Sequence, residues 1–430
     1  MILKKPRKLQ GEITVPGDKS ISHRAVMFGA LAKGTTEATH FLQSTDCLST
    51  IQCFSKMGIE IDNNRSSGVV RVKGKGLHGL SKPSSILDVG NSGTTMRLMS
   101  GILAGQSFST VITGDESIVK RPMGRIITPL SLMGGHIKGM EQEGFAPLSI
   151  ENTPKGLTGI TYELPVASAQ IKSAVLLAGM YADRETSVIE SSPSRNHTEI
   201  MLRTLGASVI SKDKCITITP QPELLAEQIQ VPGDISSAAY FIAAGLLVPN
   251  SEILLKNVGL NPTRDGIIRV CQQMGADITI SNVRNKDLEA VGDILVRSSE
   301  LKGTVIEGDL IPALIDEIPV IAVMACFSKG TTVIKDASEL KVKESNRLDV
   351  MVHNLSKLGA KITATEDGMI IEGSDSLTSG VIDSKLDHRI AMSFAVAGLV
   401  ADGDVEILGA DCVNISYPHF FDDLYQLYQS

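Results

Sequence analysis

Six apolar helical runs recur along the chain at intervals of about 70 to 80 residues. They begin near Ser20, Asn91, Ser168, Ser236, Asp316 and Asp387. Each run is followed by a polar break and then by a short β-branched stretch, for example TTVIKD from Thr331. That order of elements predicts a helix and then a strand in every interval. We therefore expect six copies of one α/β unit.

A second helix is predicted in each unit, and five of these helices end in a similar way. The matching stretches are KMGIEI (56–61), LMGGHI (132–137), TLGASV (204–209), QMGADI (273–278) and KLGAKI (357–362). Glycine just past the last apolar position is a helix C-terminal signal, and the residues after it alternate as a strand does. The period is too long for the common solenoid repeats of 20 to 50 residues.

One motif occurs twice and divides the six units three and three. VPGDKSISHR (15–24) returns as VPGDISSAAY (231–240), each time after a strand-like run. Pro-Gly predicts a turn, and we expect Ser20 and Ser236 to cap the helices that follow. Only the first copy carries cations, Lys19 and Arg24. We interpret the first copy as an anion site and the second as structural, with a domain boundary at Val231.

Length, charge and composition argue against several classes of protein. With 430 residues, two domains are the default expectation. The net charge of −7 disfavours a nucleic-acid partner. The longest apolar runs, such as Ala238 to Val248, are too short to span a membrane, and no secretory signal follows the charged N-terminus, so a cytoplasmic location is expected. The six cysteines show no metal-ligand spacing, which predicts free thiols and no zinc site.

Helix N-termini bind anions readily, so the residues at the predicted helix starts are candidate ligands. They include Lys19, Ser20 and Arg24, the loop GNSGTT (90–95) and the stretch SAQIKS (168–173). Each taken alone can equally be an ordinary helix start. Asp316 and Glu317 can likewise be simple complements of a helix dipole. Asp387 is expected to cap its helix, whereas Arg389 opposes the dipole there and needs a partner.

The second helices begin with further charged clusters. These are KRPMGR (120–125), SRNHTE (194–199), NPTRDG (261–266) and KVKESNR (341–347). A solvent-exposed face explains any one of them, but their recurrence at matching places of the repeat favours a shared site. Lys343 and Arg347 are spaced to lie on one helical face. Several cations in one cleft indicate ligands with several negative charges, and Asp316 and Glu344 beside lysines could transfer protons.

With these motifs in order, the chain resembles the EPSP synthase family, the 3-phosphoshikimate 1-carboxyvinyltransferases. The resemblance extends through PGDKSISHR, GNSGTTMR, RPMGR, ASAQIKSA, the second VPGD, LIDEIP, KVKESNR, DHRIAM and SYP. It implies an α/β fold of two domains, each with three βαβαββ units, an inside-out α/β barrel. One domain would comprise residues 15–230, and the other residues 1–14 with 231–430.

The reaction implied by the resemblance transfers the enolpyruvyl group of phosphoenolpyruvate to the 5-hydroxyl of shikimate 3-phosphate and releases phosphate. This is a step of aromatic amino acid biosynthesis, and the family is the target of glyphosate. Asp316 would act as the base that accepts the proton of the hydroxyl. Glu344 or Lys19 would protonate and deprotonate the methylene carbon of phosphoenolpyruvate. No cofactor or metal is implied, the partners would be the two small substrates, and a monomer is expected.

The resemblance also implies substrate-binding residues. Shikimate 3-phosphate would be held by Lys19, Ser20, Arg24, Ser168, Ala169, Arg195 and Lys343. Phosphoenolpyruvate would be held by Lys19, Gly93, Arg121, Gln170, Arg347 and Arg389, with Asn91 and Thr94 shaping the loop. Two positions depart from the pattern of many members: Ala169 replaces a serine, and Ile415 stands where a lysine precedes the (S/T)(F/Y)P motif.

Two alternatives stay open at this stage. The sister enzyme, which transfers enolpyruvyl to UDP-N-acetylglucosamine, shares the six-unit fold but has Lys-Asn at the position of Lys19 and Ser20. Its loop before the RP motif usually has a reactive Cys or Asp; here GDESIVKRPMG (114–124) has no Cys but contains Asp115. A binding protein that only traps anions is the other alternative, and it would not need Lys19, Asp316 and Glu344 together.

Overall fold

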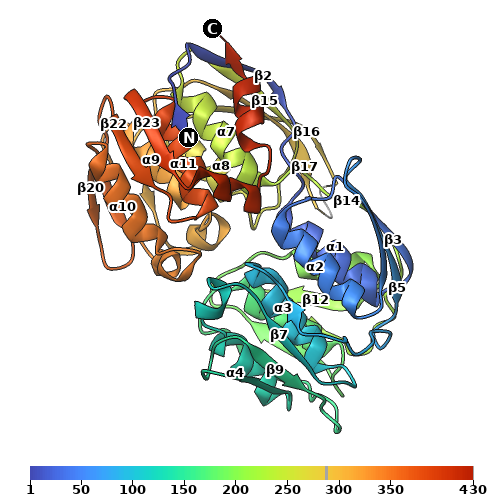
Figure 1. Ribbon diagram of the computed structural model, residues 1–430. Coiled ribbons are helices and arrows are strands. Elements are labelled where there is room, and N and C mark those ends of the chain that lie inside the picture. The colour runs from blue at the N-terminus through green and yellow to red at the C-terminus, as the bar shows by residue number, and fades with distance from the viewer. Residues whose placement is uncertain (286–288, 430) are drawn as a thin grey trace. The chain divides into compact units, whose positions relative to one another are not determined.

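The computed structural model describes residues 1–285 and 289–429. Contacts between Cα atoms divide the chain into two compact units (Figure 1). Unit 1 comprises Met1–Pro16 with Pro232–Ser430, and unit 2 comprises Gly17–Val231. The chain therefore passes between the units twice, and each passage falls within one copy of the Val-Pro-Gly-Asp motif.

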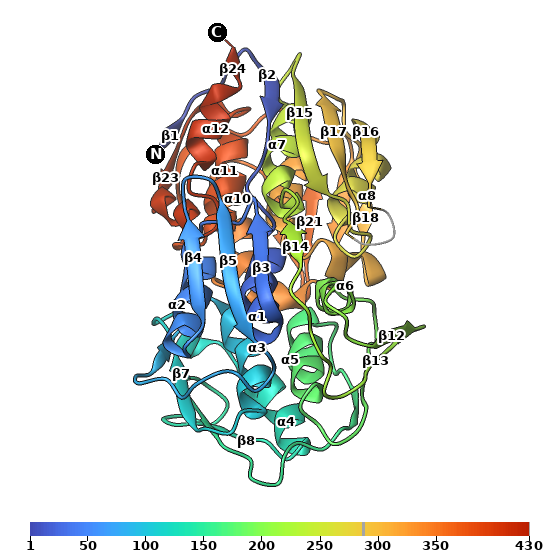
Figure 2. The ribbon, with the colours of Figure 1, turned by 90° about the vertical axis from the view of Figure 1, so that its right-hand side faces the viewer.

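Unit 2 contains three four-stranded sheets, ordered β14-β3-β5-β4, β6-β7-β9-β8 and β10-β11-β13-β12. The strands are β3 (Lys33–Thr39), β4 (Glu60–Asn64), β5 (Val69–Lys75), β6 (Leu87–Asp88), β7 (Thr110–Thr113), β8 (His136–Gly139), β9 (Leu148–Glu151), β10 (Thr161–Glu163), β11 (Thr186–Ile189), β12 (Val209–Lys212), β13 (Cys215–Ile218) and β14 (Gln228–Gln230). The α-helices are α1 (Lys19–Leu31), α2 (Thr45–Lys56), α3 (Gly93–Ala104), α4 (Gly124–Leu132), α5 (Ala169–Gly179) and α6 (His197–Thr204). Figure 2 shows β4, β5 and β3 side by side.

The described residues of unit 1 also form three sheets, ordered β16-β17-β15-β2-β24, β18-β19-β21-β20 and β1-β23-β22. The strands are β1 (Ile2–Leu3), β2 (Lys8–Ile13), β15 (Glu252–Gly259), β16 (Asp277–Arg284), β17 (Val291–Arg297), β18 (Val305–Ile306), β19 (Thr331–Ile334), β20 (Lys361–Ala364), β21 (Met369–Glu372), β22 (Thr378–Asp383), β23 (Asp402–Leu408) and β24 (Tyr428–Gln429). The α-helices are α7 (Ile235–Leu247), α8 (Gly266–Gln273), α9 (Ile318–Cys326), α10 (Arg347–Lys357), α11 (His388–Gly398) and α12 (Phe420–Gln426).

Each of the six sheets contains one parallel pair of strands, and its other pairings are antiparallel. A parallel pair needs a crossover connection, which is usually a helix. Helices α3, α5, α9 and α11 provide four of these crossovers. The remaining two pairs exchange strands: β2, before α1, pairs with β15, while β14, before α7, pairs with β3. This architecture confirms the α/β class expected from the sequence.

The first helix of every repeat lies in the interior. In unit 1, α7, α9 and α11 pack against one another, and in unit 2 α3 packs against both α1 and α5. α9 is buried along its whole length, because it is apolar on every side. Each unit has its own hydrophobic core around these helices. In the described part of the chain, every helix is too short or too polar to cross a membrane.

The five C-terminal signatures end helices as predicted. Gly58, Gly134, Gly206, Gly275 and Gly359 all have φ between 79° and 102° and directly follow the C-cap residue. In each case the N–H of the next residue returns to a carbonyl in the last turn, for example Ala276 N to Cys271 O at 2.9 Å. That backbone geometry is the Schellman arrangement, which glycine adopts without strain.

The expected caps of α1 and α7 were wrong. The N-caps are Asp18 and Asp234, not Ser20 and Ser236. Oδ1 of Asp18 accepts from Ile21 N at 2.9 Å, and Oδ1 of Asp234 accepts from Ser236 N at 2.8 Å. A carboxylate satisfies a free N–H and also complements the helix dipole. Both serines thereby move into the first turn.

Candidate functional site

The candidate residues of each unit gather near the starts of its helices. Unit 1 contains one cluster of them, and unit 2 contains several neighbouring groups. Helix starts supply N–H groups and positive potential, so each cluster suits an anionic ligand.

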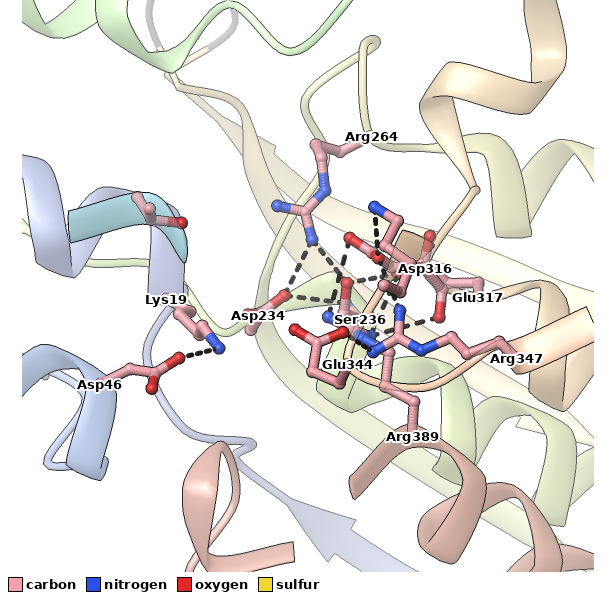
Figure 3. Close-up of polar contacts among 12 residues, drawn as sticks. Lys19, Asp46, Asp234, Ser236, Arg264, Asp316, Glu317, Glu344, Arg347 and Arg389 are labelled. Carbon is pink, nitrogen blue, oxygen red and sulfur yellow. Dashed lines mark hydrogen bonds and ion pairs between the residues drawn. The ribbon is translucent and has the colours of Figure 1, made fainter. Parts of the chain in front are cut away.

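In unit 1 the cluster is centred on Arg347, the first residue of α10 (Figure 3). Only 1% of its side chain is exposed. Its guanidinium contacts three carboxylates: Asp387 Oδ2 at 2.9 Å, Asp316 Oδ1 at 3.1 Å and Glu344 Oε2 at 2.5 Å. Burial alone would lower the pKa of Arg347, but the carboxylates, Asp387 foremost, outweigh it and raise the pKa.

Asp387 has two functions in this cluster. As predicted, it caps α11, accepting from Arg389 N at 3.0 Å. It also accepts from Arg347 and from Ser345 Oγ, the latter at 2.9 Å. Burial opposes ionisation of this carboxyl group, but the charge of Arg347 prevails and lowers the pKa of Asp387. Asp387 therefore stays an anion that holds Arg347 in place.

Asp316 contacts several of the candidate cations of unit 1. Besides Arg347, it has Lys343 Nζ at 3.4 Å from Oδ1 and Arg389 Nη2 at 3.8 Å from Oδ2. Arg389 Nη1 also donates to the Asp316 carbonyl at 3.3 Å. The partner that the sequence required for Arg389 is thus Asp316. Despite its burial, Arg389 has a raised pKa, with Asp316 as the largest favourable contribution.

Lys343 and Arg347 contact the same carboxylate, but the expectation that they share a helical face was wrong. Lys343 has extended backbone and follows a 3-10 helix, Ser338–Val342. The helix starts only at Arg347 because Asn346 caps it, accepting from Asp349 N at 3.3 Å. The two cations are brought together by the loop before α10.

In unit 2 the first candidate is Lys19, the first residue of α1. Its Nζ lies 2.5 Å from Oδ2 of Asp46, a buried carboxylate in the first turn of α2. Asp46 was not among the candidate residues, because the helix dipole alone accounts for an acid in a first turn. The pairing holds the lysine ammonium at the helix start, with its side chain one fifth exposed.

Arg24 lies one turn further along α1 and is buried. It donates to Thr198 Oγ1 at 2.8 Å, to Ser173 Oγ at 3.0 Å and to the carbonyl of Ser20 at 3.0 Å. Arg24 therefore links the starts of α1, α5 and α6. Ser20 contributes its carbonyl here, and its side chain is partly exposed.

The loop before α3 forms a second group in unit 2. Arg121 Nη2 donates to Asn91 Oδ1 at 2.7 Å, and Gln170 Nε2 donates to Thr94 Oγ1 at 3.2 Å. Arg97 donates to Gln170 Oε1 at 2.7 Å, and a Cβ on Gly93 would come within 2.8 Å of its Nη1. Glycine at position 93 is what permits this close approach. Arg97 follows this loop in the sequence but was not assigned a role, although its guanidinium donates to the candidate Gln170.

The remaining candidates of unit 2 lie at the start of α5 and before α6. Ser168 caps α5, with Oγ accepting from Ile171 N at 3.4 Å, and Ala169 is the first helical residue. Arg195 follows Ser194, whose N–H donates to Glu190 Oε1 at 3.1 Å. Lys172, buried with Glu190 and Glu199, holds the same carboxylate from the other side at 3.1 Å. This buried ion cluster fixes the segment that carries Arg195.

His23, in the first motif, lies in the interior of unit 2. It is buried, and its Nδ1 lies 2.7 Å from Thr50 Oγ1, which in turn lies 2.7 Å from Thr95 Oγ1. Burial, followed by the charges of Lys19 and Arg24, lowers the pKa of His23 well below its ordinary value. His23 is therefore neutral in the folded protein at pH 7.

Folding stability should consequently depend on pH through His23. In the unfolded chain this histidine takes up a proton below about pH 6.5, whereas in the fold it does not. The free energy of unfolding should therefore fall as pH decreases below 6.5, by up to about 1.4 kcal/mol per pH unit. His23→Asn should flatten this slope in urea denaturation between pH 7 and pH 5. The exposed His136→Asn variant is the control, and equal slopes in both variants would contradict the assignment.

In both units, arginines, lysines and carboxylates gather at helix starts of an α/β fold. Groups of this kind suit a class of enzyme that acts on small substrates with several negative charges. In the part of the chain that the structure describes, no group of His, Cys, Asp and Glu is arranged to hold a metal ion.

Comparisons with known proteins identify the family within that class. A family model described as EPSP synthase (3-phosphoshikimate 1-carboxyvinyltransferase) matches residues 3–424. A 3-phosphoshikimate 1-carboxyvinyltransferase of Thermoanaerobacter sp. (strain X514) is 56% identical over 419 residues, covering 97% of this chain and 98% of its own. One from Bacillus cytotoxicus is 54% identical over 425 residues, covering 99% of both chains.

A solved structure of EPSP synthase from Acinetobacter baumannii has a TM-score of 0.88 and 46% sequence identity. It covers 99% of this chain and 97% of its own. The chain belongs to the EPSP synthase family, as the motifs of the sequence predicted.

Proposed function

We propose that this protein transfers the enolpyruvyl group of phosphoenolpyruvate to the 5-hydroxyl of shikimate 3-phosphate and releases phosphate. The relatives at 53 to 56% identity carry the name of this activity. The observation that carries the proposal is the cluster on Asp316: one carboxylate with Arg347, Lys343 and Arg389 within 3.1 to 3.8 Å. A base and several anion-binding cations thus occupy one place.

The chemistry follows from this arrangement. The oxygen of the 5-hydroxyl attacks C2 of phosphoenolpyruvate while Asp316 accepts the proton of that hydroxyl. A second proton is delivered to C3. A tetrahedral adduct results. Loss of phosphate from C2 and of one proton from C3 then restores the double bond. Neighbouring cations favour the carboxylate form of Asp316, which a base requires.

We assign Lys19 and Glu344 to the proton transfers at C3. Lys19 is held by Asp46, and Glu344 by Arg347. Phosphoenolpyruvate is assigned to Arg347, Arg389 and Lys19 together with the group around the loop before α3: Asn91, Gly93, Thr94, Arg121 and Gln170. Shikimate 3-phosphate is assigned to Lys19, Ser20, Arg24, Ser168, Ala169, Arg195 and Lys343. Arginine suits these roles because its planar fork binds carboxylate and phosphate at two points.

The activity assay is direct. Phosphate release is expected when shikimate 3-phosphate and phosphoenolpyruvate are mixed with the protein, and none when UDP-N-acetylglucosamine replaces the shikimate ester. Release with the UDP-sugar would favour the sister activity, and binding of both substrates without release would favour an anion trap.

We also propose that the protein acts as a cytoplasmic monomer. Light scattering after gel filtration can check the monomer, and cell fractionation can check the location.

Two arginine variants test how the substrates are assigned. Arg121→Ala should weaken phosphoenolpyruvate binding about tenfold to a hundredfold, with little effect on shikimate 3-phosphate, because each charge-assisted bond contributes about 1.5 to 3 kcal/mol. Arg24→Ala should show the opposite selectivity. Titration calorimetry measures both affinities for each variant. If each variant weakened both substrates equally, the assignment would be wrong.

A further inference from the structure

The second copy of the repeated motif has a cation, although its own sequence lacks one. Arg264, from the turn before α8, is buried at the start of α7 (Figure 3). Its Nη2 donates to Asp234 Oδ1 at 3.1 Å and to Ser236 Oγ at 2.7 Å. The start of α7 is therefore charged, and its contacts extend beyond α7 to Glu317.

The contacts have a fixed direction. A guanidinium can only donate hydrogen bonds, so Ser236 Oγ accepts from Arg264. The single proton of the serine hydroxyl is then left for its other partner, Oε1 of Glu317. Glu317 is the N-cap residue of α9 and is buried. The chain of hydrogen bonds thus ends on one oxygen of a buried carboxylate.

That oxygen lies close to a cation that it does not hydrogen-bond. Glu317 Oε1 is 3.9 Å from Arg389 Nη1, whereas direct Arg–carboxylate bonds measure about 2.7 to 2.9 Å. The second oxygen, Oε2, accepts no hydrogen bond from any described residue. Arg389 Nη1 donates instead to the Asp316 carbonyl. Glu317 therefore already forms a long ion pair with Arg389 and is a potential competitor for it, but it makes no direct hydrogen bond to the guanidinium.

We propose that Ser236, supported by Arg264, is a positioning residue that keeps Glu317 at the distance of a long ion pair and prevents a direct hydrogen bond between Glu317 and Arg389. The Arg389 guanidinium then stays available for an anionic group of phosphoenolpyruvate, while Glu317 offsets part of its charge when no substrate is bound. This inference rests on the proposed function, in which Arg389 binds phosphoenolpyruvate. It gives the second motif copy a part in substrate binding without any contact to the substrate.

Ser236→Ala removes the hydroxyl that restrains Glu317, while Arg264 keeps its hydrogen bond to Asp234. Glu317 should then close onto Arg389 and compete with the substrate. We expect the KM for phosphoenolpyruvate to rise about tenfold, equivalent to about 1.4 kcal/mol, with kcat and the KM for shikimate 3-phosphate within about twofold of the parent protein. Ser237→Ala, a buried serine one residue along α7, is the matched control and should leave all three values unchanged.

The double variant Ser236→Ala/Glu317→Gln decides whether the effect comes from competition. A neutral glutamine cannot form the ion pair, so the KM for phosphoenolpyruvate should return to within about threefold of the parent value. Glu317→Gln alone should leave that KM unchanged or lower. An unchanged KM in Ser236→Ala, or a double variant that is no better than Ser236→Ala, would overturn the proposal.

A structural measurement separates this inference from the proposed function. A crystal structure of Ser236→Ala should show Glu317 Oε1 within about 3.2 Å of Arg389 Nη1. That distance does not depend on which substrates the protein uses. A distance that stays near 3.9 Å would overturn the positioning role, whereas absence of phosphate release by the parent protein would overturn the function.

Discussion

Asp316→Asn is expected to lower kcat by about a thousandfold while the fold is retained, because loss of a general base typically costs a hundredfold to ten-thousandfold. Asparagine keeps an oxygen at the position that accepts from Arg347 Nη1 at 3.1 Å, but it cannot take the proton of the 5-hydroxyl. The substrates should therefore still bind. Single-turnover phosphate release, compared with equilibrium affinities for both substrates, separates the loss of chemistry from a loss of binding.

The control for this variant is Asp375→Asn, an exposed aspartate of the same unit, which should retain full turnover. Thermal melting of both variants checks the fold, since Asp316 also contacts Lys343 and Arg389. If Asp316→Asn retained more than about a tenth of the parent kcat, Asp316 would not be the base.

The sequence predicted the parts of the fold that depend on local backbone chemistry. The five glycines from Gly58 to Gly359 end their helices where expected, because a positive φ after a helix is a requirement that one residue type meets best. The N-caps of α1 and α7 were misplaced by two residues, since Asp18 and Ser20 are both good caps and only the turn geometry decides between them.

The residues of the site were named from the sequence, but the contacts between them were not predicted. Asp316, Glu344, Arg347 and Arg389 were named because helix starts attract charged groups, and the structure does bring them together. Which carboxylate holds which cation could not be deduced, because the partners come from segments far apart in the chain. Asp387 was expected only as a cap, yet it also accepts two hydrogen bonds from Arg347.

The two motif copies show how one sequence pattern supports different roles. Asp18 and Asp234 cap their helices alike, but Ile235 replaces Lys19 and Tyr240 replaces Arg24. At the start of α7 the cation is Arg264, which comes from another segment of the chain. The charge at a helix start therefore cannot be predicted from its own residues when the fold brings a charged side chain to it from elsewhere.

Arg347→Met is expected to destabilise unit 1 by about 3 to 5 kcal/mol, because it leaves buried carboxylates without their shared cation. Asp387, Asp316 and Glu344 all contact this guanidinium, and the arginine and Asp387 are almost completely buried. Urea denaturation measures the loss. Arg347→Lys should recover only part of it, since a single ammonium cannot reach three carboxylates with the geometry of the fork.

Arg297→Met is the matched control for this prediction. Arg297 also forms a short ion pair in unit 1, 2.7 Å from Glu252, but both side chains are about half exposed. Exposed pairs contribute about 0 to 1 kcal/mol, so this variant should change the free energy of unfolding by no more than that. Burial, together with the three carboxylates that share it, is thus what should make Arg347 costly to remove. Equal losses in the two variants would show that the three carboxylates are neutralised or solvated without Arg347, and the charge balance inferred for this cluster would then be wrong.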